Sequence, residues 1–398
     1  MIDLDQIRAD TVGVDDIVHL NNCGSSLPPA PVVDAQVAYL RFEQRSGGNE
    51  AAAAHQAELD DFHVASAEML GCAADEVALQ PNAAEAWWRA FLSIPLRPGD
   101  RVLASRSEYQ GNAFGLMQAR ERGVVVDVIP HDDAGDIDLA ALEIALDRPV
   151  ALVCLTQIAM SNGAVQPAAA VGRLCRSAGV LFLLDAVQTA GQRPLDVDEI
   201  GCDFLAYTGR KFMRGPRGTG VLYARRESLD RLGPSPFVDG RSATWTGDAT
   251  WEHTAAAARF EWGERNYAAQ IGLAVATRYA LDVGLEAIAD RVITLAADLR
   301  NELDPLEGVT VRDQGRDRCG IVTFTVDGVE PAVVQRHLSA AGINVGAPTR
   351  ANAQWDIGRR DLDAVVRAGV HYFNTSDELD RLVEEVGDIR RPLPGRRV

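Results

Sequence analysis

Lys211 is the only lysine in this chain of 398 residues, and it stands in the glycine-rich segment 206–220. The other 38 of the 39 lysine and arginine residues are arginines. An arginine guanidinium stays protonated at any working pH, whereas a lysine amine can lose its proton and attack a carbonyl carbon. Chance survival of one surface lysine under a coding bias toward arginine would explain the same count. The alternative is a lysine that forms a Schiff base, which arginine cannot do.

A carboxylate stands 26 residues before this lysine, directly after the apolar run 180–184. It is Asp185, and Gln188 follows three residues later. Open α/β sheets bind ligands at the carboxyl ends of their parallel strands. An aspartate at a strand end also serves as a helix cap or a magnesium ligand. The sequence has no Gly-x-x-x-x-Gly-Lys phosphate loop, which argues against a nucleotide hydrolase.

The elements that would position these residues alternate between short apolar runs and longer helical segments. Such an alternation predicts an α/β fold with a mainly parallel sheet and helices on both faces. Buried strands are expected at 102–104, 124–129, 151–155, 180–184 and 203–207, and helices near 112–122, 138–146 and 167–178.

Three parts of the chain differ in pattern. Residues 1–30 are expected to form an irregular N-terminal arm, and 31–265 the large ligand-binding domain, which opens with a helical pattern over 31–70. The remainder, 266–398, is expected to hold a linking helix and a small C-terminal α+β domain. Its elements are predicted as a helix at 266–305, strands at 309–311, 320–326 and 366–372, a helix after Pro331 and a last helix at 377–386.

Composition limits the possible partners. The net charge of −18 and the pI of about 4.8 argue against binding to nucleic acid or to anionic membranes. The N-terminus lacks the pattern of a signal peptide, and no apolar run is long enough to span a bilayer. None of the six cysteines forms a Cys-x-x-Cys pair, which favours buried free thiols. A soluble, cytoplasmic protein is expected.

The chain resembles the class V aminotransferase branch of the fold-type-I enzymes that use pyridoxal 5'-phosphate (PLP). This branch includes cysteine desulfurases, cysteine C–S lyases, kynureninase and isopenicillin N epimerase. The resemblance spans nearly the whole chain and is carried by 185–188, 208–220, 259–261 and Arg367 before 374–375. It implies the fold-type-I architecture, PLP as cofactor, an amino acid as substrate, and a homodimer with active sites near the subunit interface.

The resemblance also implies roles for individual residues. Lys211 would carry PLP as a Schiff base and then move the proton of the substrate Cα. Asp185 would pair with the pyridine nitrogen and keep it protonated, which makes the ring an electron sink. Gln188 would bond the ring oxygen, and the Thr208 hydroxyl would bond the phosphate.

A phosphate-binding loop is expected at 80–85, before a helix that begins near Ala86. Many relatives have threonines where this chain has Ala83 and Ala84, so the backbone N–H groups would have to bind the phosphate. A plain helix N-cap is the other interpretation of this loop. Tyr109 stands where relatives have an aromatic ring, often histidine, that stacks on the cofactor.

Three arginines are candidates for a substrate carboxylate. Arg367 matches the arginine that binds the α-carboxylate of the substrate in relatives, a task that suits a bidentate guanidinium. Arg217 and Arg350 are further candidates, for a substrate carboxylate or for the cofactor phosphate. The sequence does not rank these two.

Three positions depart from the family pattern. Arg210 replaces a histidine that often precedes the lysine, and Met160 falls where many relatives have an asparagine near the ring oxygen. Glu264 replaces a threonine that in relatives reaches the phosphate in the partner subunit. A carboxylate would repel phosphate, so Glu264 is expected either to point away, paired with Arg265, or to lie in a loop of different shape.

The residues favour one reaction among several. The segment 345–366 has no cysteine, although desulfurases carry their persulfide-forming cysteine on this loop, and Cys319 is expected in the core. With Lys211 and Tyr109 left for proton transfer, Cα deprotonation and β-elimination is the simplest reaction, as in a C–S lyase acting on cysteine or an S-conjugate. An epimerase of the isopenicillin N epimerase type, an aminotransferase and a decarboxylation-linked enzyme of specialised metabolism remain alternatives. A ligand sensor without turnover is disfavoured because no basic helix-turn-helix pattern is present.

Overall fold

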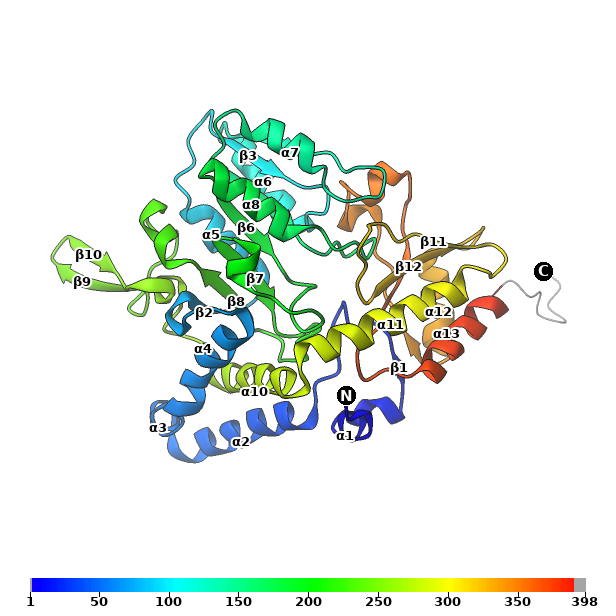
Figure 1. The fold of residues 1–398 in the computed structure, drawn as a ribbon. Helices are drawn as coiled ribbons and strands as arrows, with labels where there is room; N and C mark the ends of the chain where they lie inside the picture. The colour runs from blue at the N-terminus through cyan, green and yellow to red at the C-terminus, as the bar shows by residue number, and fades with distance from the viewer. Residues whose placement is uncertain (1, 390–398) are drawn as a thin grey trace.

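The computed structural model describes residues 2–389 and contains a seven-stranded, mainly parallel sheet, a three-stranded antiparallel sheet and two sheets of two strands each (Figure 1). The large sheet has seven strands in the order β2-β8-β7-β6-β5-β3-β4. Strands β4, β3, β5, β6 and β7 run parallel, and β8 is antiparallel to both of its neighbours. The strands are β2 Val77–Gln80, β3 Arg101–Ala104, β4 Val125–Val128, β5 Leu152–Thr156, β6 Leu181–Asp185, β7 Phe204–Thr208 and β8 Gly220–Ala224.

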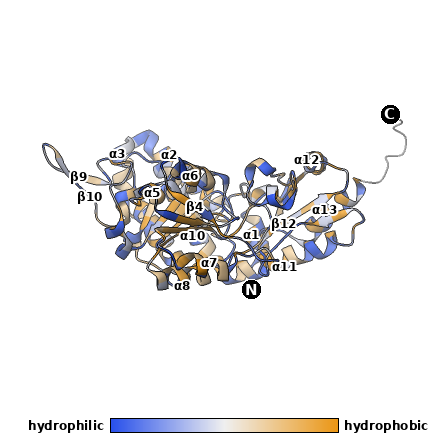
Figure 2. Ribbon diagram, turned by 90° about the horizontal axis from the view of Figure 1, so that it is seen from above, coloured by the Kyte–Doolittle hydropathy of each residue, from blue (hydrophilic) through white to orange (hydrophobic). Residues whose placement is uncertain are grey.

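Helices cover both faces of this sheet. Successive residues of a strand point to opposite sides, so the apolar residues of the buried strands line both faces of the sheet. In β6, Phe182 and Leu184 pack into a core shared with α8, whereas Leu181 and Leu183 pack into a second core shared with α5 and α6. Figure 2 shows hydrophobic colours on these central strands. The helices of this part are α2 Ala30–Ser46, α3 Gly48–Ala54, α4 Gln56–Leu70, α5 Ala83–Ser93, α6 Gln110–Glu121, α7 Leu139–Leu146, α8 Ala168–Ala178, α9 Val197–Ile200 and α10 Tyr267–Val283.

The small sheet has the order β11-β12-β14 and shares a separate core with three helices. Its strands are antiparallel, with Thr323 of β12 opposite Arg367 of β14. The elements here are α11 Leu285–Leu303, β11 Val309–Val311, β12 Ile321–Val326, α12 Pro331–Ala340, β13 Ile343–Asn344, β14 Val366–Gly369 and α13 Ser376–Asp388. The fold therefore agrees with the fold-type-I prediction, and the domain boundaries stay predictions.

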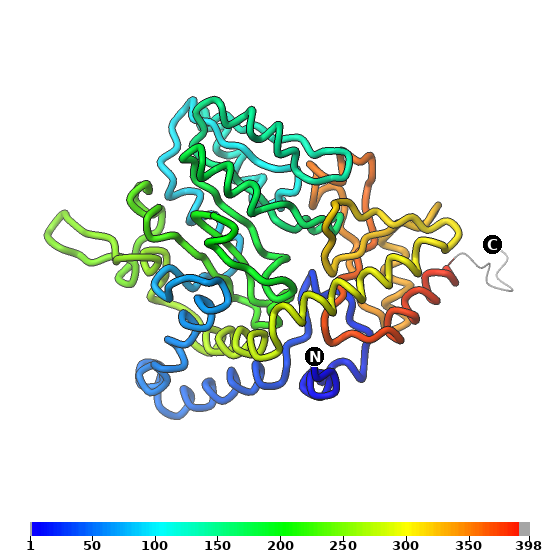
Figure 3. The backbone as a smooth tube through the Cα atoms, viewed as in Figure 1, coloured from blue at the N-terminus to red at the C-terminus, as the bar shows by residue number. Residues whose placement is uncertain are grey.

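The interpretation of residues 1–30 as irregular is wrong. They contain helix α1 (Leu4–Ala9), a 3-10 turn (Val12–Asp15) and strand β1 (Val18–His19). Strand β1 pairs in parallel with β13, and Asn21 bridges to Gly369 of β14. In Figure 3 this blue segment runs between the green and orange parts of the chain. Local sequence gives little sign of a two-residue strand whose partner lies more than three hundred residues away.

Three further predictions need correction. The segment 124–129 forms strand β4, but β4 is an edge strand and is exposed or half-buried rather than buried. The helical pattern 31–70 is divided into α2, α3 and α4, with Gly47 at φ 92° between the first two. The helix expected at 266–305 is divided at Gly284, whose φ of 91° is readily adopted only by glycine.

Three other features bear on the predictions. A hairpin of β9 (Ala243–Gly247) and β10 (Thr250–His253), which the sequence did not indicate, extends from the body in Figure 1. All six cysteines are free thiols, and five of them are buried, as predicted. Among the helices in residues 2–389, none is long and apolar enough to cross a membrane.

Candidate active site

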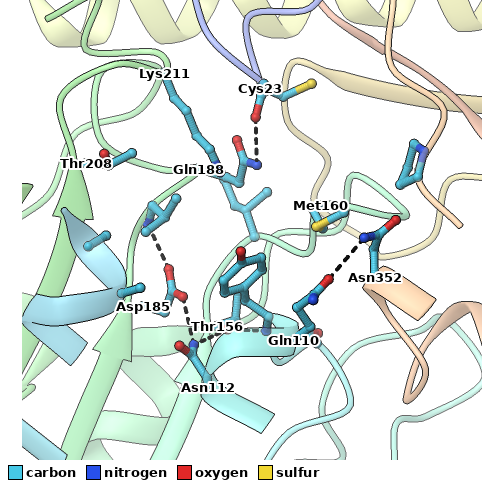
Figure 4. A pocket seen from close by; sticks show the side chains of 18 of the residues that line it. Cys23, Gln110, Asn112, Thr156, Met160, Asp185, Gln188, Thr208, Lys211 and Asn352 are labelled. Carbon is cyan, nitrogen blue, oxygen red and sulfur yellow. Dashed lines mark hydrogen bonds between the residues drawn. The ribbon is translucent and has the colours of Figure 1, made fainter. Parts of the chain in front are cut away.

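A cavity of about 540 Å³ lies at the carboxyl ends of the central strands (Figure 4). Three adjacent parallel strands each end in a polar residue that lines it: Thr156 on β5, Asp185 on β6 and Thr208 on β7. This is the edge at which open parallel sheets bind ligands. The remaining lining residues are Cys23, Gly24, Asn82, Ala83, Ala84, Ser107, Tyr109, Gln110, Asn112, Ile158, Met160, Val187, Gln188, Arg210, Lys211, Ala347, Pro348, Asn352 and Arg367.

Asp185 lies at the base of the cavity and is buried. Its Oδ2 accepts a hydrogen bond of 2.8 Å from Asn112 Nδ2, and its Oδ1 accepts one of 2.9 Å from the backbone N–H of Val187. Burial raises the pKa of Asp185 above its usual value, and these two bonds and the nearby charge of Lys211 offset only part of this rise. The carboxylate is thus held in one orientation by donors on two sides.

Lys211 reaches the same cavity from the turn that follows β7. The chain folds back tightly here and requires glycine at position 209, because a Cβ there would lie 2.3 Å from Thr219 Oγ1. Removal from solvent, followed by the charges of Arg367 and Arg210, lowers the pKa of Lys211 to about 7. A substantial fraction of the amine is therefore neutral and nucleophilic at neutral pH.

This lowered pKa predicts how the protein captures a carbonyl compound. We expect the rate constant for covalent attachment of PLP to the apo-protein to rise between about pH 6 and 8 and then to level off. The sign follows because only the neutral amine attacks, and an ordinary lysine would stay protonated until about pH 10. Stopped-flow absorbance checks this expectation, and a midpoint near pH 10 would contradict it.

The loop before α5 presents the first helical residues to the cavity. Asn82 caps the helix, its Oδ1 accepting a 2.9 Å bond from the Glu85 N–H, and Ala83 and Ala84 line the cavity. The helix begins at Ala83, three residues earlier than predicted. A Cβ on Gly220 would lie 2.5 Å from the backbone carbon of Asn82, so only glycine there permits this loop position. A helix N-terminus of this kind binds anions through its free N–H groups.

Thr208 lines the cavity as expected, but its hydroxyl already has an acceptor. Its Oγ1 donates a 3.0 Å bond to the carbonyl oxygen of Thr219. The hydroxyl proton is therefore directed at the backbone rather than into the cavity. A bond from Thr208 to a phosphate stays a prediction, and it requires the hydroxyl to rotate.

Gln188 and Tyr109 lie on two walls of the cavity. Gln188 Nε2 donates a 3.1 Å bond to the carbonyl oxygen of Cys23, and its buried Oε1 accepts no hydrogen bond from residues 2–389. Tyr109 is 40% exposed and precedes α6, and its ring lies over Gly111, where a Cβ would be 2.9 Å from Cε1. The tyrosine ring is thus free to contact a ligand in the cavity.

Of the three candidate arginines, only Arg367 lines the cavity. It is buried, its Nη1 donates a 3.3 Å bond to the carbonyl oxygen of Met160, and its Nε has no acceptor within residues 2–389. Arg217 is exposed outside the cavity. Arg350 also lies outside it, with Nη2 3.1 Å from Asp363 and Nε bonded to the carbonyl oxygen of Leu362. The expectation that these two reach the ligand finds no support in their positions.

Two of the three residues that depart from the family pattern line the cavity, and the third does not. Met160 and Arg210 line the cavity, and the Arg210 guanidinium donates to the carbonyl oxygen of Gly24. Glu264 is exposed and lies outside the cavity. Arg265 donates hydrogen bonds to Gln270 Oε1 and to the carbonyl oxygen of Trp262, rather than pairing with Glu264.

Several further residues line the cavity. Cys23 and Gly24 come from the N-terminal segment, which the β1–β13 pairing places at the cavity. Asn112 lies one helical turn after Glu108, and Asn352 Nδ2 donates a 3.0 Å bond to Gln110 Oε1 across the cavity. The helical spacing of Glu108 and Asn112 on either side of Tyr109 could have indicated a polar wall here.

The residues present fit PLP. The helix N-terminus at Ala83 suits a phosphate, Gln188 Oε1 and Arg367 Nε are buried polar atoms without a hydrogen-bond partner among residues 2–389, and a carboxylate and an amine face one cavity of ligand size. An anionic, aromatic aldehyde would engage each of these groups.

Comparisons with known proteins agree with this site. The family model described as aminotransferase class V matches residues 18–382, so the chain belongs to the class V aminotransferase family. PLP, the cofactor of this family, is therefore the cofactor of the protein, which is a PLP-dependent enzyme.

The chain is similar to curated and solved proteins over nearly its full length. A probable cysteine desulfurase of Methanothermobacter thermautotrophicus is 29% identical over 391 residues, covering 97% of this chain and 98% of that protein. The apo structure of a cysteine desulfurase from Thermococcus onnurineus NA1 superposes with a TM-score of 0.91 at 25% identity, covering 98% of each chain. The cystine C–S lyase C-DES, solved with its product cysteine persulfide, gives a TM-score of 0.84 at 24% identity, covering 95% of this chain and 99% of that one.

Proposed function

We propose that the protein is a PLP-dependent C–S lyase that removes the Cα proton of cysteine or of an S-conjugate and eliminates the sulfur substituent. The products would be pyruvate, ammonia and a sulfur compound. The observation that carries this proposal is the loop 345–366, which faces the cavity with Ala347, Pro348 and Asn352 and contains no cysteine. A desulfurase needs a thiol there to accept sulfur.

The one cysteine that lines the cavity is poorly placed for that role. A Cβ on Gly369 would lie 2.7 Å from Cys23 Sγ, so the sulfur is packed against the backbone of β14. Figure 4 shows this sulfur directed away from Lys211. Cys319 is buried in a small apolar cluster, and burial raises its pKa to about 12, so its thiol stays protonated. These positions favour release of sulfur into solution over a protein-bound persulfide.

Four cavity residues have proposed tasks in this reaction. When bound, PLP supplies an electron sink for the negative charge left at the substrate Cα. Asp185 would hold a proton on the ring nitrogen, and Gln188 would bond the ring oxygen. Lys211 Nζ would remove the Cα proton, for which its lowered pKa suits it. Tyr109 would stack on the ring and is the second candidate for proton transfer.

The α-carboxylate of the substrate is proposed to bind Arg367, whose free Nε lies in the cavity wall. We expect Arg367→Ala to raise KM about 30-fold or more with a smaller effect on kcat, because truncating one partner of a buried charge pair costs about 2 to 5 kcal/mol. Steady-state pyruvate formation measures it. Arg350→Ala, outside the cavity, is the matched control, and equal effects of both variants would contradict the assignment.

The reaction itself is tested with the purified holoenzyme and cysteine, cystine or S-conjugates. A coupled assay for pyruvate, together with mass spectrometry of the protein for persulfide, separates the outcomes. Pyruvate without protein persulfide supports the lyase. A keto acid that keeps its side chain would establish an aminotransferase, inversion at Cα without pyruvate would establish an epimerase, and alanine with a protein persulfide would establish a desulfurase.

A further inference from the structure

A second carboxylate is buried behind the cavity and has no task in the reaction described above. Glu108 precedes α6 and is 4% exposed. Its Oε1 accepts a 3.0 Å bond from the backbone N–H of Thr156, and its Oε2 lies 3.0 Å from Thr156 Oγ1. The same Thr156 hydroxyl oxygen lies 3.4 Å from the backbone N–H of Tyr109. Glu108 is thus connected to two residues that line the cavity.

Asn112 joins Glu108 to Asp185. Its Nδ2 donates a 2.8 Å bond to Asp185 Oδ2 and a 3.1 Å bond to Glu108 Oε2, so one side-chain amide serves both carboxylates. Asn112 itself is 1% exposed. Figure 4 shows the bond from Asn112 to Asp185 at the cavity floor. Two buried acids that share one amide influence each other's protonation.

The charges around the pair leave one of the acids uncompensated. The groups that face Glu108 are Asn112 of α6, Cys154 and Thr156 of β5, Asp185 of β6 and Ser105, which follows β3. Lys211, in the turn after β7, faces Asp185. The largest influences on the pKa of Glu108 are burial, Asp185, Asn112 and Thr156, and none of these is a cation. Burial, followed by repulsion from Asp185, raises the pKa of Glu108 to about 7.

We propose that Glu108 is a positioning residue: Glu108 and Asp185, which Asn112 joins, hold one proton between them, and the pair yields this proton to the ring nitrogen when PLP binds. The step balances: the pair goes from one proton to none, and the nitrogen gains one proton and a positive charge. That charge then compensates two ionised carboxylates instead of one. The proposal rests on the proposed contact between Asp185 and the ring nitrogen and is independent of the reaction that follows.

The proposal predicts a pH dependence of cofactor affinity with a definite sign. Below about pH 7 Glu108 already carries its proton before PLP binds, so the wild-type protein resembles Glu108→Gln; above about pH 7 Glu108 is ionised, and its negative charge strengthens binding of the protonated ring. Glu108→Gln imitates the protonated acid at every pH. The ratio of the variant's Kd to the wild-type Kd should therefore rise from about 1 at pH 6 to about 10 at pH 8.5, a tenfold change for each pKa unit of coupling.

The experiment is a titration of the two apo-proteins with PLP across this pH range, followed by fluorescence. Taking the ratio removes the titrations of Lys211 and of PLP itself, which both proteins share. Glu121→Gln changes an exposed acid at the end of α6; it is the matched control and should give a ratio near 1 throughout. Glu108→Asp should restore the pH dependence, which a role in packing alone would not. A flat ratio for Glu108→Gln overturns the proposal.

A measurement on the wild-type protein covers the case in which Glu108→Gln fails to fold. The infrared difference spectrum between apo- and holo-protein at pH 6.5 should show the loss of a protonated carboxyl band on PLP binding. Absence of that loss also overturns the proposal. Failure here is distinct from failure of the lyase assignment, because pyruvate formation and lysine labelling are measured separately.

Discussion

Replacing Lys211 by alanine is expected to abolish covalent attachment of PLP and to lower the turnover rate at least about 10⁴-fold. The amine is proposed both to hold the cofactor and to move the Cα proton, and no second lysine exists to replace it. The wild-type protein with PLP should absorb at roughly 410–430 nm, and borohydride should remove this band. Peptide mapping by mass spectrometry should then place the reduced label on Lys211 alone.

Two comparisons make this result interpretable. Lys211→Arg keeps a positive charge beside Asp185 but cannot form the bond, so it should behave like the alanine variant in labelling. Arg217→Ala changes an exposed residue of the same segment and should leave the band intact. If Lys211→Ala retained the band or the labelling, the Schiff-base assignment would fail, and the single lysine would be explained by coding bias.

The sequence predicts the groups that sit at strand and helix ends better than those that reach the cavity from elsewhere. Asp185 and Thr208 terminate apolar runs that form β6 and β7, and Lys211 follows at the next turn. The strand ends of a parallel sheet converge, so local pattern was sufficient to bring these residues together. Asn112 was missed because its function depends on its spatial proximity to Asp185, 73 positions further along the chain.

The cavity walls from the chain ends depend on contacts between distant parts of the chain. Cys23 reaches the site because β1 pairs with β13 and Asn21 bridges to Gly369, contacts that span more than three hundred residues. Arg217 and Arg350 were plausible by type and position in sequence, yet the first turns to solvent and the second pairs with Asp363. Charge alone does not indicate the direction of a side chain, whereas burial and free donor atoms, as at Arg367, do.

Asp185→Asn is expected to lower kcat/KM about 10³-fold and to weaken PLP binding by a similar factor. The variant keeps the size of the side chain but removes the charge that would hold a proton on the ring nitrogen. Breaking a buried ion pair costs about 3 to 5 kcal/mol, which is two to nearly four powers of ten. Both quantities are measurable, by pyruvate formation and by titration of the apo-protein with PLP.

The control for this variant is Asp133→Asn, an exposed acid that should change neither quantity by more than about twofold. At saturating PLP, Asp185→Asn should still give a borohydride-reducible label on Lys211, because the amine remains. Loss of turnover with retention of the label would separate two tasks: Lys211 attaches the cofactor, and Asp185 makes it withdraw electrons. Full activity in this variant would mean that the ring nitrogen need not be protonated, and the proton shared by Glu108 and Asp185 would then have no role in catalysis.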